Sequence, residues 1–118
     1  MKLDAHTIIS LFHIFLVGPL FLYVAIKAAN NPKWMFPFLL GLGTFIIVYH
    51  AYLVYKKMMI GKSAWVNYIH VLLVGPLLVY IGYTGLDTSR KFFEMLMMLG
   101  MAAIGYHGYY LVQSLNLV

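Results

Sequence analysis

Charged residues interrupt this chain at only a few places, and long apolar stretches separate them. The charges gather at residues 2–4, 27–33, 56–62 and 87–94. The apolar stretches cover about 7–29, 34–56, 63–84 and 91–114. About twenty apolar residues in helical conformation cross the hydrocarbon layer of a bilayer. The pattern therefore predicts four transmembrane helices.

The composition places the chain in a membrane. Hydrophobic residues make up 64% of the 118 residues and charged residues 9%, whereas soluble domains have about 45–50% and about 25%. We therefore expect an integral, multi-pass protein whose main partner is the lipid bilayer. The net charge of +5 suits anionic lipid, but no basic block is long enough for nucleic acid. The chain has no cysteine, which excludes disulfides and thiolate metal sites.

The orientation in the membrane does not follow from the charges. On the side of the N-terminus the basic residues are Lys2, Lys56, Lys57 and Lys62, and on the other side they are Lys27, Lys33, Arg90 and Lys91. Four against four leaves no excess for the positive-inside rule. The uncharged outer surface would also permit a homo-oligomer.

The chain contains an internal repeat. Residues 13–26 read HIFLVGPLFLYVAI and residues 70–83 read HVLLVGPLLVYIGY, with seven of fourteen positions identical. The same shift of 57 residues aligns Gly43 with Gly100 and His50 with His107. The first repeat covers about 7–57 and the second about 63–114.

The repeat predicts the architecture. Each copy contains two spans, so each is a helical hairpin, and both copies cross the membrane in the same direction. Parallel repeats of this kind are related by an axis along the membrane normal. We therefore predict an all-α membrane protein: a four-transmembrane-helix antiparallel bundle built from two parallel-repeat hairpins with a pseudo-twofold axis. Residues 1–118 form a single membrane domain.

Four histidines occupy similar depths in the four predicted spans. They are His13, His50, His70 and His107. Each lies five to seven residues from the end of its span on the N-terminal side of the membrane, about 8–10 Å below the surface at 1.5 Å per residue. The sequence thus predicts a four-histidine layer near one membrane face, although it does not determine which way the rings point. Ionisable residues at this depth usually face the interior of the bundle.

Histidine chemistry favours ligand binding as the function. Neutral imidazole binds metal ions and can ligate haem iron axially. We predict that all four histidines bind cofactor, either haem b or a metal ion, for electron transfer or sensing, with haem ahead of copper or zinc. Gly43 and Gly100 lie seven residues before His50 and His107, on the same helix face. These glycines would leave room for a macrocycle, or would instead allow close helix packing.

Two other functions remain open. A ring of four imidazoles could conduct protons or ions, and histidines copied by duplication could be purely structural. Catalysis by the chain itself is not expected, because its acids, Asp4, Asp87 and Glu94, lie in or beside loops. If the protein performs chemistry, a bound cofactor supplies it.

Two further features bear on the histidines. Gly18-Pro19 and Gly75-Pro76 lie near the middle of two spans, where proline removes a backbone donor and should kink the helix. Near the histidine layer, His6, Ser10 and Asn67 could form a polar mouth and orient the imidazoles as neighbouring hydrogen-bonding groups.

Overall fold

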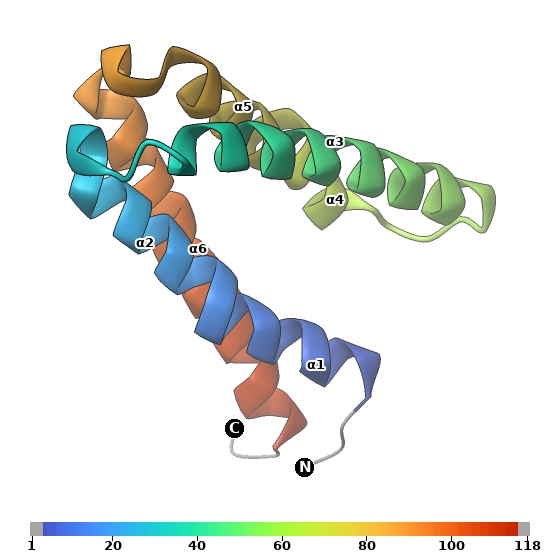
Figure 1. The fold of residues 1–118 in the computed structure, drawn as a ribbon. Coiled ribbons are helices and arrows are strands. Elements are labelled where there is room, and N and C mark those ends of the chain that lie inside the picture. The colour runs from blue at the N-terminus through green and yellow to red at the C-terminus, as the bar shows by residue number, and fades with distance from the viewer. Residues whose placement is uncertain (1–3, 116–118) are drawn as a thin grey trace. The chain divides into compact units, whose positions relative to one another are not determined.

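A computed structural model describes residues 4–115, which are helical almost throughout (Figure 1). The elements are α1 (Ala5–Phe12), the π-helical turn η1 (His13–Val17), α2 (Gly18–Lys27), the 3-10 turn η2 (Ala28–Asn30), α3 (Met35–Met59), α4 (Trp65–Ile69), the π-helical turn η3 (His70–Val74), α5 (Gly75–Thr84), the 3-10 turn η4 (Gly85–Asp87) and α6 (Arg90–Ser114). No strand occurs within the described range. The predicted all-α class is confirmed.

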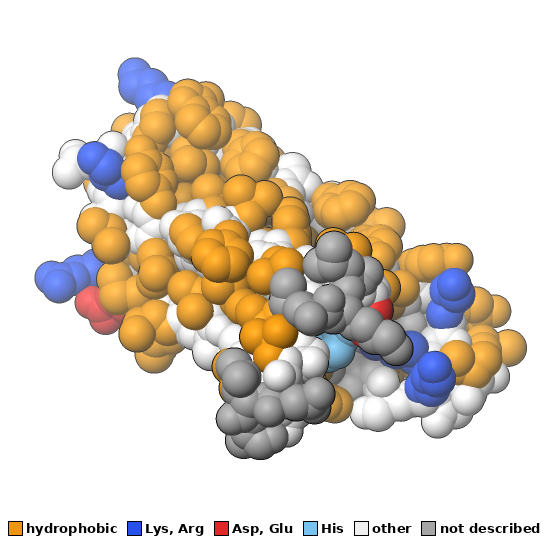
Figure 2. Space-filling model, turned by 90° about the horizontal axis from the view of Figure 1, so that it is seen from below, with side chains coloured by type: hydrophobic (Ala, Val, Ile, Leu, Met, Phe, Trp, Pro, Cys, Tyr) orange, Lys and Arg blue, Asp and Glu red, His pale blue; other side chains and the backbone are white. Residues whose placement is uncertain are grey.

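Within residues 4–115, four helical stretches are long and apolar enough to cross a membrane. They are Ala5–Asn30, Met35–Met59, Trp65–Asp87 and Arg90–Ser114. Every end lies within three residues of the end predicted from the sequence. Figure 2 shows hydrophobic side chains over much of the visible surface, with few charged ones among them. Such a surface is typical of lipid-facing helices.

The chain forms two compact units. The first unit contains α1, η1, α2 and the part of α6 from Phe93 onward, and the second unit runs from Ala29 to Phe92. The units do not coincide with the sequence repeats, because each unit combines one span from each repeat. The pseudo-twofold axis between the repeats stays a prediction.

In the second unit, α3 packs antiparallel to the span formed by α4, η3 and α5. The buried residues of α3 are Met35, Phe36, Leu39 and Gly43, and those of α5 are Gly75, Leu77, Leu78 and Ile81. A Cβ atom added to Gly43 would lie 2.7 Å from the carbonyl oxygen of Gly75 and 2.8 Å from the backbone nitrogen of Val79. The two helices therefore touch backbone to backbone, which requires glycine at this point.

In the first unit, α6 packs antiparallel to the span formed by α1, η1 and α2. The buried residues of α6 are Phe93, Leu96, Gly100 and His107, which recur at helical spacing on one face. A Cβ atom on Gly100 would lie 3.1 Å from the carbonyl oxygen of Gly18. Gly100 and Gly18 are the repeat equivalents of Gly43 and Gly75, so both units use the same glycine contact.

The glycine contact predicts a contrast between two neighbouring glycines of α3. Gly43→Ala should destabilise the protein by about 1–3 kcal/mol, because the added methyl group meets backbone atoms that cannot move aside. A methyl group on Gly41 would have no neighbouring atom within 4 Å, so Gly41→Ala should stabilise α3 by up to about 1 kcal/mol. Thermal unfolding in mild detergent, followed by circular dichroism, measures both effects. Equal melting temperatures for the two variants would contradict the contact.

Candidate functional site

The four histidines of the spans form two stacked pairs, one in each unit. In the first unit the ring centroids of His13 and His107 lie 4.1 Å apart with an interplanar angle of 21°. In the second unit those of His50 and His70 lie 4.0 Å apart with an angle of 14°. In each pair, one histidine (His13 or His70) precedes a Gly-Pro in its own span, and the other (His107 or His50) comes from a helix that has no Gly-Pro. The candidate site is therefore a pair of facing imidazoles that occurs twice.

A π-helical turn begins at the first histidine of each pair. The backbone N–H of Gly18 donates to the carbonyl of His13, and that of Gly75 donates to the carbonyl of His70. In an α-helix, residues five apart lie about 140° apart around the axis. The wider π-turn brings them to nearly the same side. The turn thus allows one helix face to present both the histidine and the close-packing glycine.

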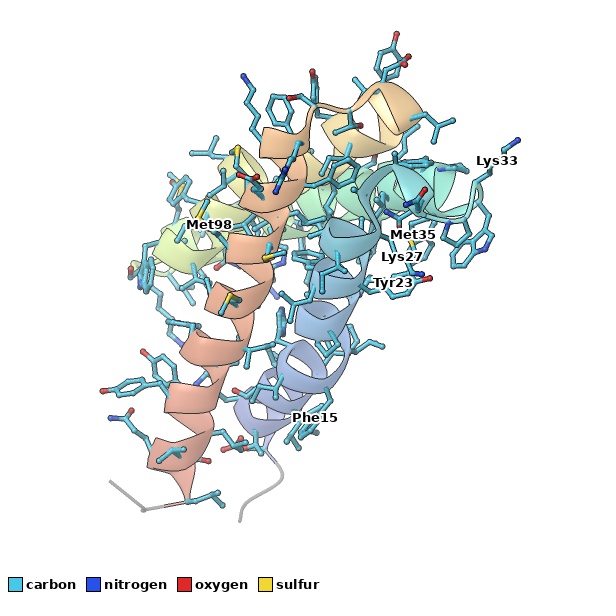
Figure 3. All side chains as sticks on the ribbon, turned by 90° about the vertical axis from the view of Figure 1, so that its left-hand side faces the viewer. Phe15, Tyr23, Lys27, Lys33, Met35 and Met98 are labelled. Carbon is cyan, nitrogen blue, oxygen red and sulfur yellow. The ribbon has the colours of Figure 1, made fainter. Side chains whose placement is uncertain are left out.

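The middle residue of each π-turn points outward. Phe15 is 73% exposed and projects away from α6 in Figure 3, and Leu72 in the equivalent turn is 72% exposed. The turn lies just before Pro19 or Pro76, which has no N–H to donate. The α-helical hydrogen-bond pattern is interrupted there in any case, so the π-turn adds little cost. The sequence predicted a change at the proline, but not its π-helical form.

The first histidine of each pair is oriented by its own helix. His13 Nδ1 donates to the carbonyl of Ile9 at 2.8 Å, and His70 Nδ1 donates to the carbonyl of Val66 at 2.8 Å. A carbonyl oxygen can only accept, so Nδ1 carries the proton and Nε2 carries the lone pair. Metal-binding histidines are commonly oriented by a bond of this kind from the other ring nitrogen.

A polar network flanks the second histidine pair. The Lys57 ammonium donates to Oδ1 of Asn67, and Nδ2 of Asn67 lies 2.8 Å from Nδ1 of His50. Asn67 is buried, with 4% of its surface exposed. The sequence placed Asn67 near the histidines, but it did not predict that its partner is His50 on the facing helix. Lys57 was missed, because a lysine at the end of a span usually marks only the membrane boundary.

The first pair has different polar neighbours. Ser10 and Thr7 are buried on α1. The ring of Tyr106 meets that of His107 edge-on with centroids 5.2 Å apart. His6 is exposed, and its ring lies 5.1 Å from that of Tyr110. Serine, threonine and tyrosine hydroxyls can both donate and accept hydrogen bonds, unlike the ammonium of Lys57 beside the second pair.

The structure brings the predicted site residues together two by two. No group of three or more His, Cys, Asp or Glu side chains in the described residues is arranged to hold a metal ion. That all four histidines form one layer stays a prediction. Beside Gly43 and Gly100 lies the backbone of the facing helix, so these glycines serve helix packing and leave no room for a macrocycle at their level.

The fold and the site define an all-helical protein with helices long and apolar enough to cross a membrane and with two stacked histidine pairs. Comparisons with protein-family models, curated proteins and solved structures give no significant match to this chain. The function is therefore argued from the geometry of the site.

The π-turn predicts an unusual tolerance to deletion. Removing Leu72 together with Pro76→Ala should convert η3 into a regular helical turn, with His70 and Gly75 now four positions apart. Residues four apart share a face of an α-helix, so both contacts with α3 should survive. We expect a cooperative thermal transition close to that of the Pro76→Ala variant alone.

The control is a deletion in regular helix. Removing Tyr80 together with Pro76→Ala leaves η3 intact but rotates the following residues by about 100°. This should bury the wrong face of α5 and destabilise the protein by roughly 3 kcal/mol or more. If both deletions have the same effect on thermal unfolding, the π-turn does not align the histidine with the glycine.

Proposed function

We propose that this protein is a multi-pass integral membrane protein that binds a transition-metal ion, with copper the best match, through its stacked histidines. The observation that carries the proposal is the facing of two imidazoles at 4.0–4.1 Å in each unit. Two metal–nitrogen bonds of about 2.0–2.1 Å require nitrogens no more than about 4 Å apart. Because imidazole lone pairs lie in the plane of the ring, the stacked rings would have to turn until both lone pairs point at one ion.

The stacked geometry favours a metal ion over haem. Axial ligation by two histidines requires the iron between the rings, with one ring on each face of the macrocycle. Rings stacked face to face at 4.0–4.1 Å leave no space for a macrocycle between them. Haem binding would require the two helices to separate, against the backbone contact at the glycines two turns deeper.

The ligand chemistry favours copper. Among divalent first-row ions, Cu²⁺ binds nitrogen ligands most tightly, and imidazole suits it well. The hydrogen bonds from Nδ1 of His13 and His70 to backbone carbonyls leave the lone pair of each ring on Nε2, where a metal ion can bind. A site with only two protein ligands keeps open coordination positions, which suits electron transfer or sensing near a membrane face.

The proposal includes the predicted architecture, an antiparallel four-helix bundle with a pseudo-twofold axis along the membrane normal. Its support comes from matching contacts at positions 57 residues apart. Both units contain a π-turn before Gly-Pro, a glycine contact and a stacked histidine pair. Duplication of one ancestral hairpin would explain all three.

The stacking also bears on a proton relay. A proton passes between imidazoles along an N–H···N line in the plane of the rings, so the face-to-face rings would have to turn for a relay, as they would for a shared metal ion. A purely structural role agrees with the stacking and with the bonds to backbone carbonyls. A measurement of metal binding therefore distinguishes the purely structural role from the proposed function.

We predict that the purified protein binds Cu²⁺ and that the bound ion is coordinated by imidazole nitrogen. Equilibrium dialysis measures the stoichiometry, and electron paramagnetic resonance detects coupling between copper and ¹⁴N. His107→Phe keeps an aromatic ring in the stack but removes the ligand, so binding at that pair should fall at least roughly tenfold. His6→Phe is the matched control, because His6 lies outside both pairs, and it should bind copper like the unchanged protein.

Two outcomes would overturn this proposal. The first is that the protein binds no copper, or binds copper that shows no coupling to nitrogen; either result would leave a purely structural role for the histidines. The second is a Soret band in protein from haem-replete cells that disappears in His107→Phe, which would establish haem instead.

A further inference from the structure

The two histidine pairs differ chemically, and the difference lies in Lys57 and Asn67. We propose that Lys57, acting through Asn67, holds His50 with its proton on Nε2 and thereby keeps the second pair from binding metal, so that the first ion binds at His13 and His107. The order of metal binding rests on the proposed function, whereas the position of the proton on His50 is independent of that function.

The pattern follows from donors and acceptors. An ammonium group has only donors, so the Asn67 atom that contacts Lys57 must be the oxygen. The Asn67 amide nitrogen, which can only donate, then faces Nδ1 of His50 at 2.8 Å. Nδ1 must accept this bond, and the ring proton of neutral His50 therefore resides on Nε2.

This places the two stacked rings in opposite forms. His70 has its proton on Nδ1, because Nδ1 donates to the carbonyl of Val66. The lone pair on Nε2 of His70 suits a metal ion. His50 instead has an N–H at Nε2, and the lone pair on its Nδ1 accepts the hydrogen bond from the amide of Asn67. A nitrogen that carries a proton cannot coordinate metal, so the pair supplies only one ligand.

Recruiting His50 would require the whole network to change. Ligation through Nε2 needs a proton on Nδ1, which would then point at the donating amide of Asn67. Turning the amide would present its oxygen to His50 but its nitrogen to the Lys57 ammonium, donor against donor. Lys57 therefore has to leave before His50 can bind metal. Lys57 and Asn67 are thus positioning residues that act through His50.

The first unit has different residues at the equivalent positions. The repeat equivalent of Asn67 is Ser10, and that of Lys57 is Ser114. Ser10 is 1% exposed, and its hydroxyl can turn to donate or accept. The hydroxyl of Ser114 donates to the carbonyl of Leu111 in its own helix. With serine in place of the ammonium and the amide, these two positions do not oppose an ion at His13 and His107.

The protonation pattern is tested without metal. In protein labelled with ¹⁵N-histidine, the nitrogen chemical shifts should assign the proton of His50 to Nε2 and that of His70 to Nδ1, with His50→Phe identifying the His50 signals. Lys57→Met should shift the His50 signals toward a mixture of the two forms. Lys56→Met is the matched control, because Lys56 lies over the ring of Tyr52 and should leave the His50 signals unchanged.

The order of binding is tested with copper alone. In a His13→Phe/His107→Phe background, which isolates the second pair, Lys57→Met should raise Cu²⁺ affinity roughly tenfold, the usual size of effects from groups that orient metal ligands. Lys56→Met should not, although it removes the same charge from the same helix turn. In the unchanged protein, the tighter site should disappear in His107→Phe and persist in His50→Phe.

The outcomes separate the two proposals. A His50 proton on Nδ1, or equal effects of Lys57→Met and Lys56→Met, would overturn the inference even if copper binds. If the nitrogen shifts are as expected but no variant binds copper, the proposed function fails. Lys57 and Asn67 would still determine the position of the ring proton on His50.

Discussion

The contact of helix backbones at paired glycines is the constraint on which both histidine sites depend. Gly43 meets the backbone at Gly75, and Gly100 meets it at Gly18. At this separation, side chains one or two turns away on the same face must also meet. The histidines occupy those positions, so their stacking follows from the glycine contact. The π-turns supply the remaining requirement, since without them His13 and Gly18 would lie on different faces of one helix.

The sequence was sufficient for everything that depends on hydrophobic length and on recurrence. Apolar runs between charge clusters predicted four helices with ends correct to within three residues, because hydrocarbon thickness dictates the length of a span. The recurrence of His, Gly and Pro singled out the four residues that form the stacked pairs. Comparison of repeats detects such residues without knowledge of any partner.

The pairing itself was beyond the sequence. Helical periodicity assumes 3.6 residues per turn, so a five-residue interval from His13 to Gly18 placed them on different faces, and only the π-turn reconciles them. The role of Lys57 was hidden for another reason. Its contact with Asn67 spans the connection between two helices, and the charge pattern alone marks Lys57 only as the end of a span.

Duplication of one hairpin, as proposed, would explain why the helix contacts match while the polar neighbours do not. A glycine between two backbones tolerates almost no substitution, so both copies of that contact would be retained. Polar residues beside the histidines face a weaker requirement, because each need only satisfy its own hydrogen bonds. Asn67 meets it by connecting a histidine to an ammonium, whereas its repeat equivalent Ser10 carries a hydroxyl that can either donate or accept. Under the proposed function, two sites with the same backbone would in this way differ in affinity, because one ring would keep a nitrogen for a ligand and the other would use it within the protein.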